Sequence, residues 1–363
     1  MTAQERFIKT MHFDLVDRVP YWVPIFWAET IEKWQTEGHP FTNEYDEEKR
    51  FDCDHKEHIR MWLNFEPPFE EKVLESDIEY LTVQTPKGII EKVLKSRLRD
   101  SQISHPLQYP IKNRDDYLKY HSRLTGNVKE RLNKVGNLER HVTRDYAVSL
   151  RGSLDCGFYG PLRDLVGFER LNYLFYDDPI LITMMMDDRA ELIIQMLERI
   201  LDKTTIDWFC FWEDMAYKNG SMISPDMFRK FMMPRYRLIT DYLHKRGIDL
   251  IFVDSDGDIS QLIPLWLECG VNGMWPFEVQ AGMDVLMLRK EYGRDLLLIG
   301  GLDKRELAKG KKEIEQEIIK KVPPLIKDGG YIPRPDHSIP PDVSYDNYKY
   351  FMEYLRKVIE KGI

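Results

Sequence analysis

Acidic and imidazole side chains follow three short apolar runs in the C-terminal half of the chain. Asp254 and Asp256 come directly after one run, Glu213 directly after a second, and His337 shortly after a third. Carboxylates and imidazole transfer protons at neutral pH when their surroundings shift their pKa values, and they also coordinate divalent cations. The sequence therefore indicates acid–base or metal chemistry, provided that the fold gathers these groups.

Each of these groups also has a structural explanation. A carboxylate beside Trp212 is poorly solvated, which would raise the pKa of Glu213 toward that of a general acid, but a salt bridge from Glu213 to Lys218 or Arg151 is an equal alternative. Similarly, Asp336 is adjacent to the candidate imidazole and could orient it.

The alternating acids Asp254, Asp256 and Asp258 could converge on one ion in a turn. The structural alternatives are that Asp258 caps a helix beginning at Ile259 and that Asp254 pairs with a nearby lysine. For Asp303, a helix cap is the favoured role.

The elements that must position these groups follow a regular pattern of apolar runs, each followed by a helical segment. Such a pattern is typical of parallel strands covered by helices, and it predicts an α/β fold of the (β/α)8 TIM-barrel type. In such a barrel the strands' C-terminal ends meet at one face, where the chemistry lies. Strands are predicted near residues 20, 147, 207, 250, 272, 297 and 331, with one more in the helix-rich block that ends near Lys203.

The N-terminal part of the chain departs from this pattern. Residues 1–130 are predicted to be helical and β-hairpin additions that include the first barrel strand at 19–26 and a hairpin at 80–94 over the barrel mouth. Residues 131–363 then form the main barrel, and we expect the chain 1–363 to be a single domain.

The composition narrows the range of partners. The net charge of −9 argues against nucleic acid or an acidic membrane surface as principal ligand, since both need a concentrated basic face. No apolar run approaches the roughly 20 residues that span a bilayer, and the first residues do not resemble a secretory signal, so we expect a cytoplasmic protein. The sequence leaves the oligomeric state open, a homodimer included.

Five segments together resemble the uroporphyrinogen decarboxylase superfamily: Val16–Pro20, Asp256-Gly257, Gly300–Asp303, His337–Pro340 and Tyr345–Asn347. The resemblance extends over essentially the whole chain and implies a (β/α)8 barrel. Members of this superfamily include the porphyrinogen decarboxylase itself and cobalamin-dependent methyltransferases.

Two departures from the family patterns bear on function. The decarboxylase carries two substrate-binding arginines where this chain has Ile25 and Glu29, which argues against porphyrinogen decarboxylation. The thiol methyltransferases carry zinc ligands at positions that correspond here to Asp254, Asp256 and His337. These side chains also suit Zn²⁺, although without the soft sulfur environment of a thiol-activating site.

The resemblance leads us to expect a methyltransferase component, similar to an O-demethylase, that passes a methyl group from a methoxylated or N-methylated small molecule to a corrinoid (cobalamin) on a separate corrinoid protein. Glu213, Asp254 and His337 are the predicted catalytic groups, because the leaving oxygen or nitrogen must be protonated or metal-bound. The predicted substrate-binding residues are Trp27, Arg151, Tyr159, Trp212, Trp275 and Glu278.

Two other functions remain open at this point. One is a decarboxylase of a small carboxylic acid or tetrapyrrole, in which Asp254 or His337 donates a proton to a carbanion. The other is a non-catalytic corrinoid- or tetrapyrrole-binding protein whose carboxylates only position the ligand.

Overall fold

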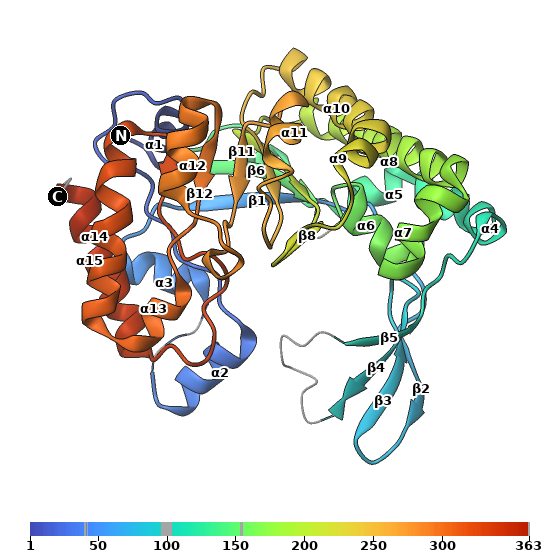
Figure 1. The fold of residues 1–363 in the computed structure, drawn as a ribbon, viewed down its shortest axis with the longest axis horizontal. Helices are drawn as coiled ribbons and strands as arrows, with labels where there is room; N and C mark the ends of the chain where they lie inside the picture. The colour runs from blue at the N-terminus through green and yellow to red at the C-terminus, as the bar shows by residue number, and fades with distance from the viewer. Residues whose placement is uncertain (40, 42, 96–103, 153–154, 362–363) are drawn as a thin grey trace.

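A curved sheet of parallel strands forms the centre of the molecule (Figure 1). The computed structural model describes residues 1–39, 41, 43–95, 104–152 and 155–361. All pairs of neighbouring strands in the sheet are parallel. In spatial order the strands are β1 (Lys56–Met61), β6 (Ala147–Gly152), β7 (Trp208–Trp212), β10 (Ile251–Asp254), β11 (Gly273–Trp275), β12 (Leu297–Ile299) and β13 (Tyr331–Ile332).

Helices cover the outer face of the sheet. Each strand alternates its side chains between two faces, and the apolar side chains on the outer face pack against the helices. In β7, Phe209 and Phe211 belong to the large outer core, whereas Trp208 and Cys210 belong to a separate inner cluster. The covering helices are α4 (Arg114–Thr125), α5 (Val128–Asn133), α6 (Tyr159–Val166), α7 (Phe168–Asp177), α8 (Pro179–Leu201), α10 (Met233–Lys245), α11 (Ile263–Glu268) and α12 (Val285–Tyr292).

A second apolar core packs the C-terminal helices against the N-terminal segment. Val19 and Tyr21 contribute to this core, and the Tyr21 hydroxyl donates to the Met352 carbonyl over 2.7 Å. The helices around it are α2 (Ala28–Thr36), α3 (Glu44–Phe51), α13 (Lys304–Lys309), α14 (Lys311–Asp328) and α15 (Tyr345–Lys361).

The strand order corrects two predictions. The helix-rich block contains α6, α7 and α8 and no strand within its described residues; the strand that the sequence pattern missed is β1. Residues 19–26, predicted as the first strand, are irregular. They meet the sheet region through a parallel bridge between Phe26 and Ile339 and a hydrogen bond from the Asp54 amide to the Tyr21 carbonyl. Among the described residues the parallel sheet has seven strands, with β1 and β13 at its two ends, where eight were predicted. The expected α/β barrel-like architecture is otherwise confirmed.

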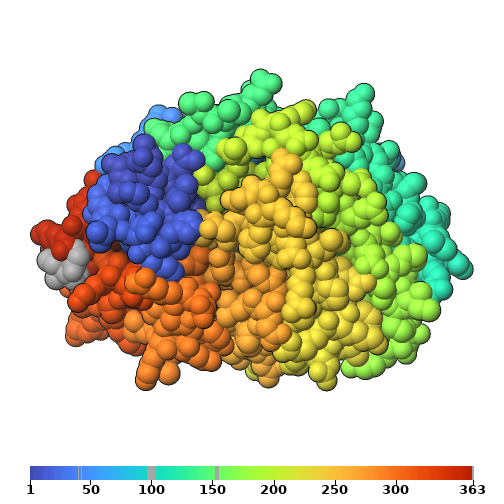
Figure 2. Space-filling view, turned by 90° about the horizontal axis from the view of Figure 1, so that it is seen from above, coloured from blue at the N-terminus to red at the C-terminus, as the bar shows by residue number. Residues whose placement is uncertain are grey.

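The first helix, α1 (Ala3–Met11), closes the amino end of the barrel. Its Phe7 and Met11 pack in the inner cluster with Trp22 and Trp208, and Thr10 accepts a hydrogen bond from the Gly330 amide. Figure 2, which views the face opposite the projecting sheet of Figure 1, shows the N-terminal segment in blue beside the orange and red C-terminal segments. With this end filled, the interior is accessible from the carboxyl ends of the strands.

The predicted hairpin is part of a four-stranded antiparallel sheet: β2 (Lys72–Ser76), β3 (Tyr80–Gln84), β4 (Ile90–Leu94) and β5 (His105–Gln108). In Figure 1 this sheet projects from the side of α6 and α7. Lys87 in the hairpin turn pairs with Asp164 of α6 over 2.6 Å. None of the helices among the described residues is both long and apolar enough to cross a membrane.

Candidate active site

The strand register gathers the candidate residues at one end of the sheet. Asp254, the last residue of β10, lies opposite Trp212 of β7 on one side and Trp275 of β11 on the other. Residues paired across parallel strands point to the same face, so one carboxylate sits between two indoles. Arg151 of β6 is paired with Cys210, which precedes Trp212 by two residues in β7, so Arg151 lies nearer the amino ends of the strands.

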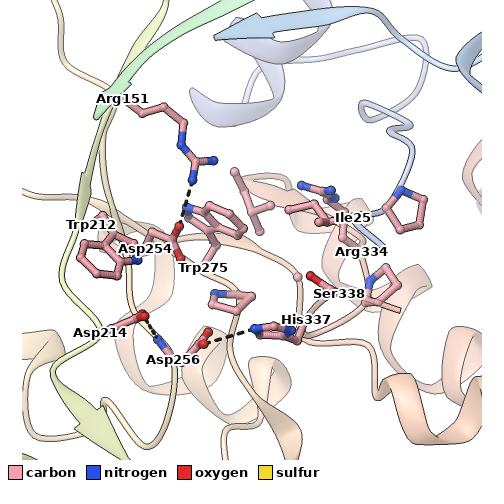
Figure 3. A pocket seen from close by; sticks show the side chains of 15 residues that line it. Ile25, Arg151, Trp212, Asp214, Asp254, Asp256, Trp275, Arg334, His337 and Ser338 are labelled. Atoms are coloured by element: carbon pink, nitrogen blue, oxygen red, sulfur yellow. Dashed lines mark hydrogen bonds and ion pairs between the residues drawn. The ribbon is translucent and has the colours of Figure 1, made fainter. Parts of the chain in front are cut away.

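These side chains line a cavity of about 210 Å³, which we call the acidic chamber (Figure 3). Its carboxylates are Asp214, Asp254 and Asp256, and His337 faces them from the segment after β13. The remaining lining residues are Pro24, Ile25, Arg151, Trp212, Trp275, Pro276, Ile299, Gly300, Arg334, Pro335 and Ser338.

Two ion pairs hold part of this acidic charge. Arg151 Nη2 lies 3.3 Å from Asp254 Oδ2, so Asp254 pairs with an arginine and not with the expected lysine. The His337 Nε2 atom lies 3.2 Å from Asp256 Oδ2. The other ring nitrogen of His337, Nδ1, is buried without a hydrogen-bond partner.

Asp214 reaches the chamber through an unusual backbone conformation. Its φ of 42° lies in the left-handed region that non-glycine residues rarely adopt, and such strain persists only where the surroundings impose it. Arg163 donates to the Asp214 carbonyl over 2.6 Å, and the Asp256 amide donates to Asp214 Oδ1 over 3.2 Å. These bonds fix the carboxylate beside that of Asp256.

The surroundings of Asp214, Asp254 and His337 shift the pKa values of these three side chains. Burial, together with the charge of Asp256, raises the pKa of Asp214 to about 7. Burial also raises the pKa of Asp254 well above its usual range; Arg151 opposes this shift, and the two neighbouring aspartates add to it. Burial alone would lower the pKa of His337, but its hydrogen bond to Asp256 and the charge of that carboxylate leave the pKa raised. Near neutral pH the chamber therefore holds acid groups that can donate protons.

Two groups of side chains in the described structure are close enough to hold a metal ion. Asp256, Glu278 and His337 form one group, and Asp214, Asp254 and Asp256 form the other; within each group the ligand atoms lie within 4.8 Å of one another. The predicted ligands Asp254 and His337 thus fall in different groups, with Asp256 common to both. The Glu278 carboxylate also accepts a hydrogen bond from the Gly257 amide over 3.0 Å, and its Oε1 atom lies 3.5 Å from Lys304 Nζ.

Glu213, a predicted catalytic residue, lies outside the chamber. Its carboxylate is fully buried on the helix side of β7, where it accepts hydrogen bonds from the amides of Phe158, Tyr159 and Gly160 at the start of α6 and from the Tyr236 hydroxyl. An anionic group at a helix N-terminus satisfies amides that have no partner within the helix. The structure thus gives Glu213 an architectural position and places its neighbour Asp214 in the cavity.

Three predicted substrate-binding residues, Trp27, Tyr159 and Glu278, also lie outside the lining of the acidic chamber. Tyr159 is fully buried and stacks on Phe175, and Trp27 precedes α2 and lines neither this cavity nor the second one described below. Arg151, Trp212 and Trp275 do line the acidic chamber.

The remaining acids behave as structural groups. Asp303 caps α13 as predicted, with its side chain accepting from the Arg305 amide. Asp258 accepts from the Ser260 amide over 3.0 Å, capping a turn before α11. Asp336 accepts from the amides of Val279 and Lys304, so its carboxylate braces two loops and does not orient the adjacent imidazole.

A second cavity, of about 320 Å³, adjoins the first, and the sequence pattern did not reveal it. We call it the basic chamber, because its polar lining includes Lys56, His58 and Arg60 of β1 together with Arg151 and Arg334. The available signal was the alternation of these three β1 residues with Ile59 and Met61, which are buried in or near the outer core. Its other lining residues are Trp22, Ile25, Glu44, Trp208, Trp275 and Ile299.

The fold and the site together define a class of protein: a parallel α/β barrel whose acidic and imidazole groups meet at the carboxyl ends of the strands. A family model for uroporphyrinogen decarboxylase (URO-D) matches residues 162–358, which is more than half of the chain. The chain belongs to this family, as its sequence motifs predict.

Comparison with solved structures agrees on the fold. The chain is similar to a methyltransferase from Methanosarcina mazei, with a TM-score of 0.62 and 14% sequence identity over 98% of this chain and 99% of the other. A B12-independent methionine synthase from Shewanella sp. W3-18-1, in complex with selenomethionine, aligns over 92% of this chain and 86% of the other at 8% identity, but its TM-score of 0.34 is too low to indicate a common fold. No curated protein matches the chain.

Proposed function

We propose that the protein is a methyltransferase that takes a methyl group from a methoxylated or N-methylated small molecule and passes it to the corrinoid of a separate protein. The observation that carries this proposal is the convergence of Asp214, Asp254, Asp256 and His337 on one cavity. The URO-D family and the fold shared with a methyltransferase are consistent with it.

The difficult part of such a transfer is the departure of an oxygen or nitrogen anion, which needs a proton or an electrophile. Asp214 has a pKa of about 7, and the pKa of Asp254 is also raised, so either carboxyl group can hold a proton for the leaving atom. This assignment replaces Glu213 with Asp214. Trp212 and Trp275 supply flat apolar walls for the donor molecule.

A divalent cation also fits beside Asp256 and His337 of the acidic chamber. Asp256, Glu278 and His337 would hold it, since one ligand atom of each lies within 4.8 Å of the others. Carboxylate and imidazole ligands suit Zn²⁺. When bound, the ion would supply Lewis-acid polarisation of the donor's oxygen or nitrogen.

A decarboxylase of a small acid is the second candidate, and one feature favours it. Arg151 and Arg334 both line the acidic chamber, close to carboxyl groups that can donate a proton. A guanidinium can hold a carboxylate while a neighbouring acid protonates the carbanion left by loss of carbon dioxide.

A donor panel separates the candidates. Purified protein is mixed with methoxylated aromatics and methylated amines and with a reduced corrinoid protein, and the cobalt(I) absorbance is followed; carbon dioxide release and the metal content are measured in parallel. We expect loss of the cobalt(I) band with at least one donor, and no carbon dioxide.

The matched variants are Asp256→Asn in the chamber and Asp226→Asn on the exposed surface. Only the first should strongly slow the absorbance change. Carbon dioxide release without a cobalt signal would replace the proposal with decarboxylation. Binding of a corrinoid with no turnover of any donor would indicate a carrier.

A further inference from the structure

The basic chamber holds three cations that form no ion pair among the described residues. Lys56, His58 and Arg60 share one face of β1 because side chains two residues apart point the same way, and Arg334 approaches from the segment after β13. Among the described residues, Lys56, Arg60 and Arg334 form no ion pair with any carboxylate. Glu44 is the acidic member of the lining, and it is exposed at the rim.

Burying such charges without a partner is costly. Arg334 is only 9% exposed, and its guanidinium donates to the Val23 carbonyl over 3.0 Å. Burial and the nearby Arg151 lower the pKa of Arg334 to about 10, and burial and the nearby Arg334 lower the pKa of Lys56 to about 8. An anion in this chamber would relieve both effects.

The chamber walls suit an organic anion. Trp22, Trp208 and Trp275 contribute indole surfaces, and the Lys56 ammonium lies 5.4 Å from the centre of the Trp22 ring. His58 is neutral, since burial and the surrounding cations lower its pKa, and it bonds to the Ser149 hydroxyl over 2.5 Å. Aromatic surface next to fixed cations is the lining that a flat molecule with an acidic end requires.

The two chambers form one continuous site, because Ile25, Arg151, Trp275, Ile299 and Arg334 line both of them. Among the described residues, the Arg151–Asp254 ion pair is the one that joins the acidic and basic groups. A ligand that spans the shared wall therefore meets cations at one end and proton-donating acids at the other.

We propose that the substrate carries a carboxylate or phosphate group that is seated in the basic chamber, so that its reactive end is held against the acids and His337 of the acidic chamber. This inference rests on the proposed function in that it states which part of the methyl donor is recognised and how the donor is oriented. The inference also predicts that neutral methyl ethers and amines are poor substrates.

The test compares an acid with its neutral isostere. Equilibrium binding of 4-methoxybenzoate, 4-methoxybenzamide and phenyl phosphate is measured by isothermal titration calorimetry, without any corrinoid present. We expect at least one of the two anions to bind ten times more tightly than the amide. A preference for 4-methoxybenzoate or for phenyl phosphate then distinguishes a carboxylate from a phosphate.

Variants assign the preference to the chamber. Arg334→Met and Lys56→Met should each reduce the preference for the anion several-fold, whereas Arg334→Lys should retain part of it. Arg170→Met, at an exposed position of α7, is the control and should bind as the wild type does. Circular dichroism and the unfolding temperature show whether each variant is folded.

Equal affinity for acid and amide, or a preference that survives both methionine variants, would overturn the inference. The proposed function fails separately. Tight, chamber-dependent binding of anions without methyl transfer refutes the methyltransferase but leaves the anion site standing. Methyl transfer from neutral donors alone refutes the anion site but leaves the methyltransferase standing.

Discussion

The acidic and basic chambers share a wall but differ in how their charges are satisfied. In the acidic chamber the carboxylates lie beside a histidine, an arginine and one another, and burial raises the pKa of Asp214 and Asp254. In the basic chamber the arginines cannot lose their charge at neutral pH, and no described carboxylate pairs with Lys56, Arg60 or Arg334. A purely structural cluster would neutralise itself, so this separation of charge indicates a site built for a ligand with two different ends.

The largest expected effect comes from removing the carboxylate common to both metal-ligand groups. Asp256→Asn deletes the partner of His337 and one member of each group while preserving the size of the side chain. We expect the rate of methyl transfer to fall by about 10²- to 10⁴-fold, the usual contribution of a positioned acid–base group. Single-turnover kinetics on the cobalt band provide the measurement.

Asp258→Asn is the nearby control for that variant, because Asp258 caps a turn and lines neither chamber. Its rate should stay within a factor of about two or three of the wild-type rate, since surface substitutions are nearly neutral. Equal losses in the two variants would show that the effect is one of folding.

Glu213 provides the next contrast, between a buried acid of the scaffold and an acid of the cavity. Three backbone N–H groups donate hydrogen bonds to the Glu213 carboxylate. In Glu213→Gln the amide nitrogen, itself a donor, faces some of these N–H groups. The free energy of unfolding should fall by about 1–3 kcal/mol, the cost of leaving buried hydrogen-bonding groups unsatisfied. Urea unfolding measures this value.

The rate of the folded Glu213→Gln protein should change far less than that of Asp256→Asn. A large loss of rate with unchanged stability would return Glu213 to the catalytic centre and contradict its assignment to the start of α6.

The raised pKa of Asp214 makes stability depend on pH in a defined direction. Because the folded-state pKa of about 7 exceeds the ordinary aspartate value of 3.8, the folded protein binds a proton more tightly than the unfolded chain. This contribution is fully present below pH about 4 and is lost as the pH rises to about 7. Asp214→Asn should therefore gain about 1–2 kcal/mol relative to wild type between pH 5 and pH 8, a figure reduced from the full linkage value because the cavity is open to solvent.

Urea unfolding of both proteins at pH 5 and pH 8 tests this effect. Asp155, whose pKa burial raises to about 6, titrates in both proteins and cancels in the comparison. An equal difference in stability at the two pH values would show that Asp214 titrates normally.

The smallest effect is expected for the pair that links the chambers. Arg151→Met removes the 3.3 Å contact to Asp254, which borders an open cavity, so the free energy of unfolding should change by less than about 1 kcal/mol. The pKa of Asp254 should rise further, because Arg151 now opposes the effect of burial. Infrared titration of the protonated carboxyl band detects this shift.

The sequence patterns located the apolar strands of the barrel because their burial on both faces leaves a continuous signal. β7, β10, β11, β12 and β13 all begin within a residue or two of the predicted runs. β1 carries polar side chains at each inward position, so its pattern resembles a surface strand. Segment 19–26, rich in apolar residues, is buried but irregular. Hydrophobicity thus identified the scaffold more readily than the charged lining.

The side-chain assignments show a similar division. Asp254 and His337 could be placed in the cavity because they follow strands at the end where a barrel carries its site. Glu213 was expected in the cavity, although the alternation of side chains along β7 indicates otherwise. Trp208, Cys210 and Trp212 face inward, so the next residue, Glu213, faces the helices. The positive φ of Asp214 comes from contacts with distant residues that a local pattern does not contain.

One measurement tests the two-ended site most directly: a crystal structure of the protein with 4-methoxybenzoate bound. We expect the carboxylate to lie within hydrogen-bond distance of Arg334 or Lys56 and the methoxy group to point toward Asp256 and His337. A carboxylate held by Arg151 alone with the ring reversed, or a ligand bound outside both chambers, would contradict it.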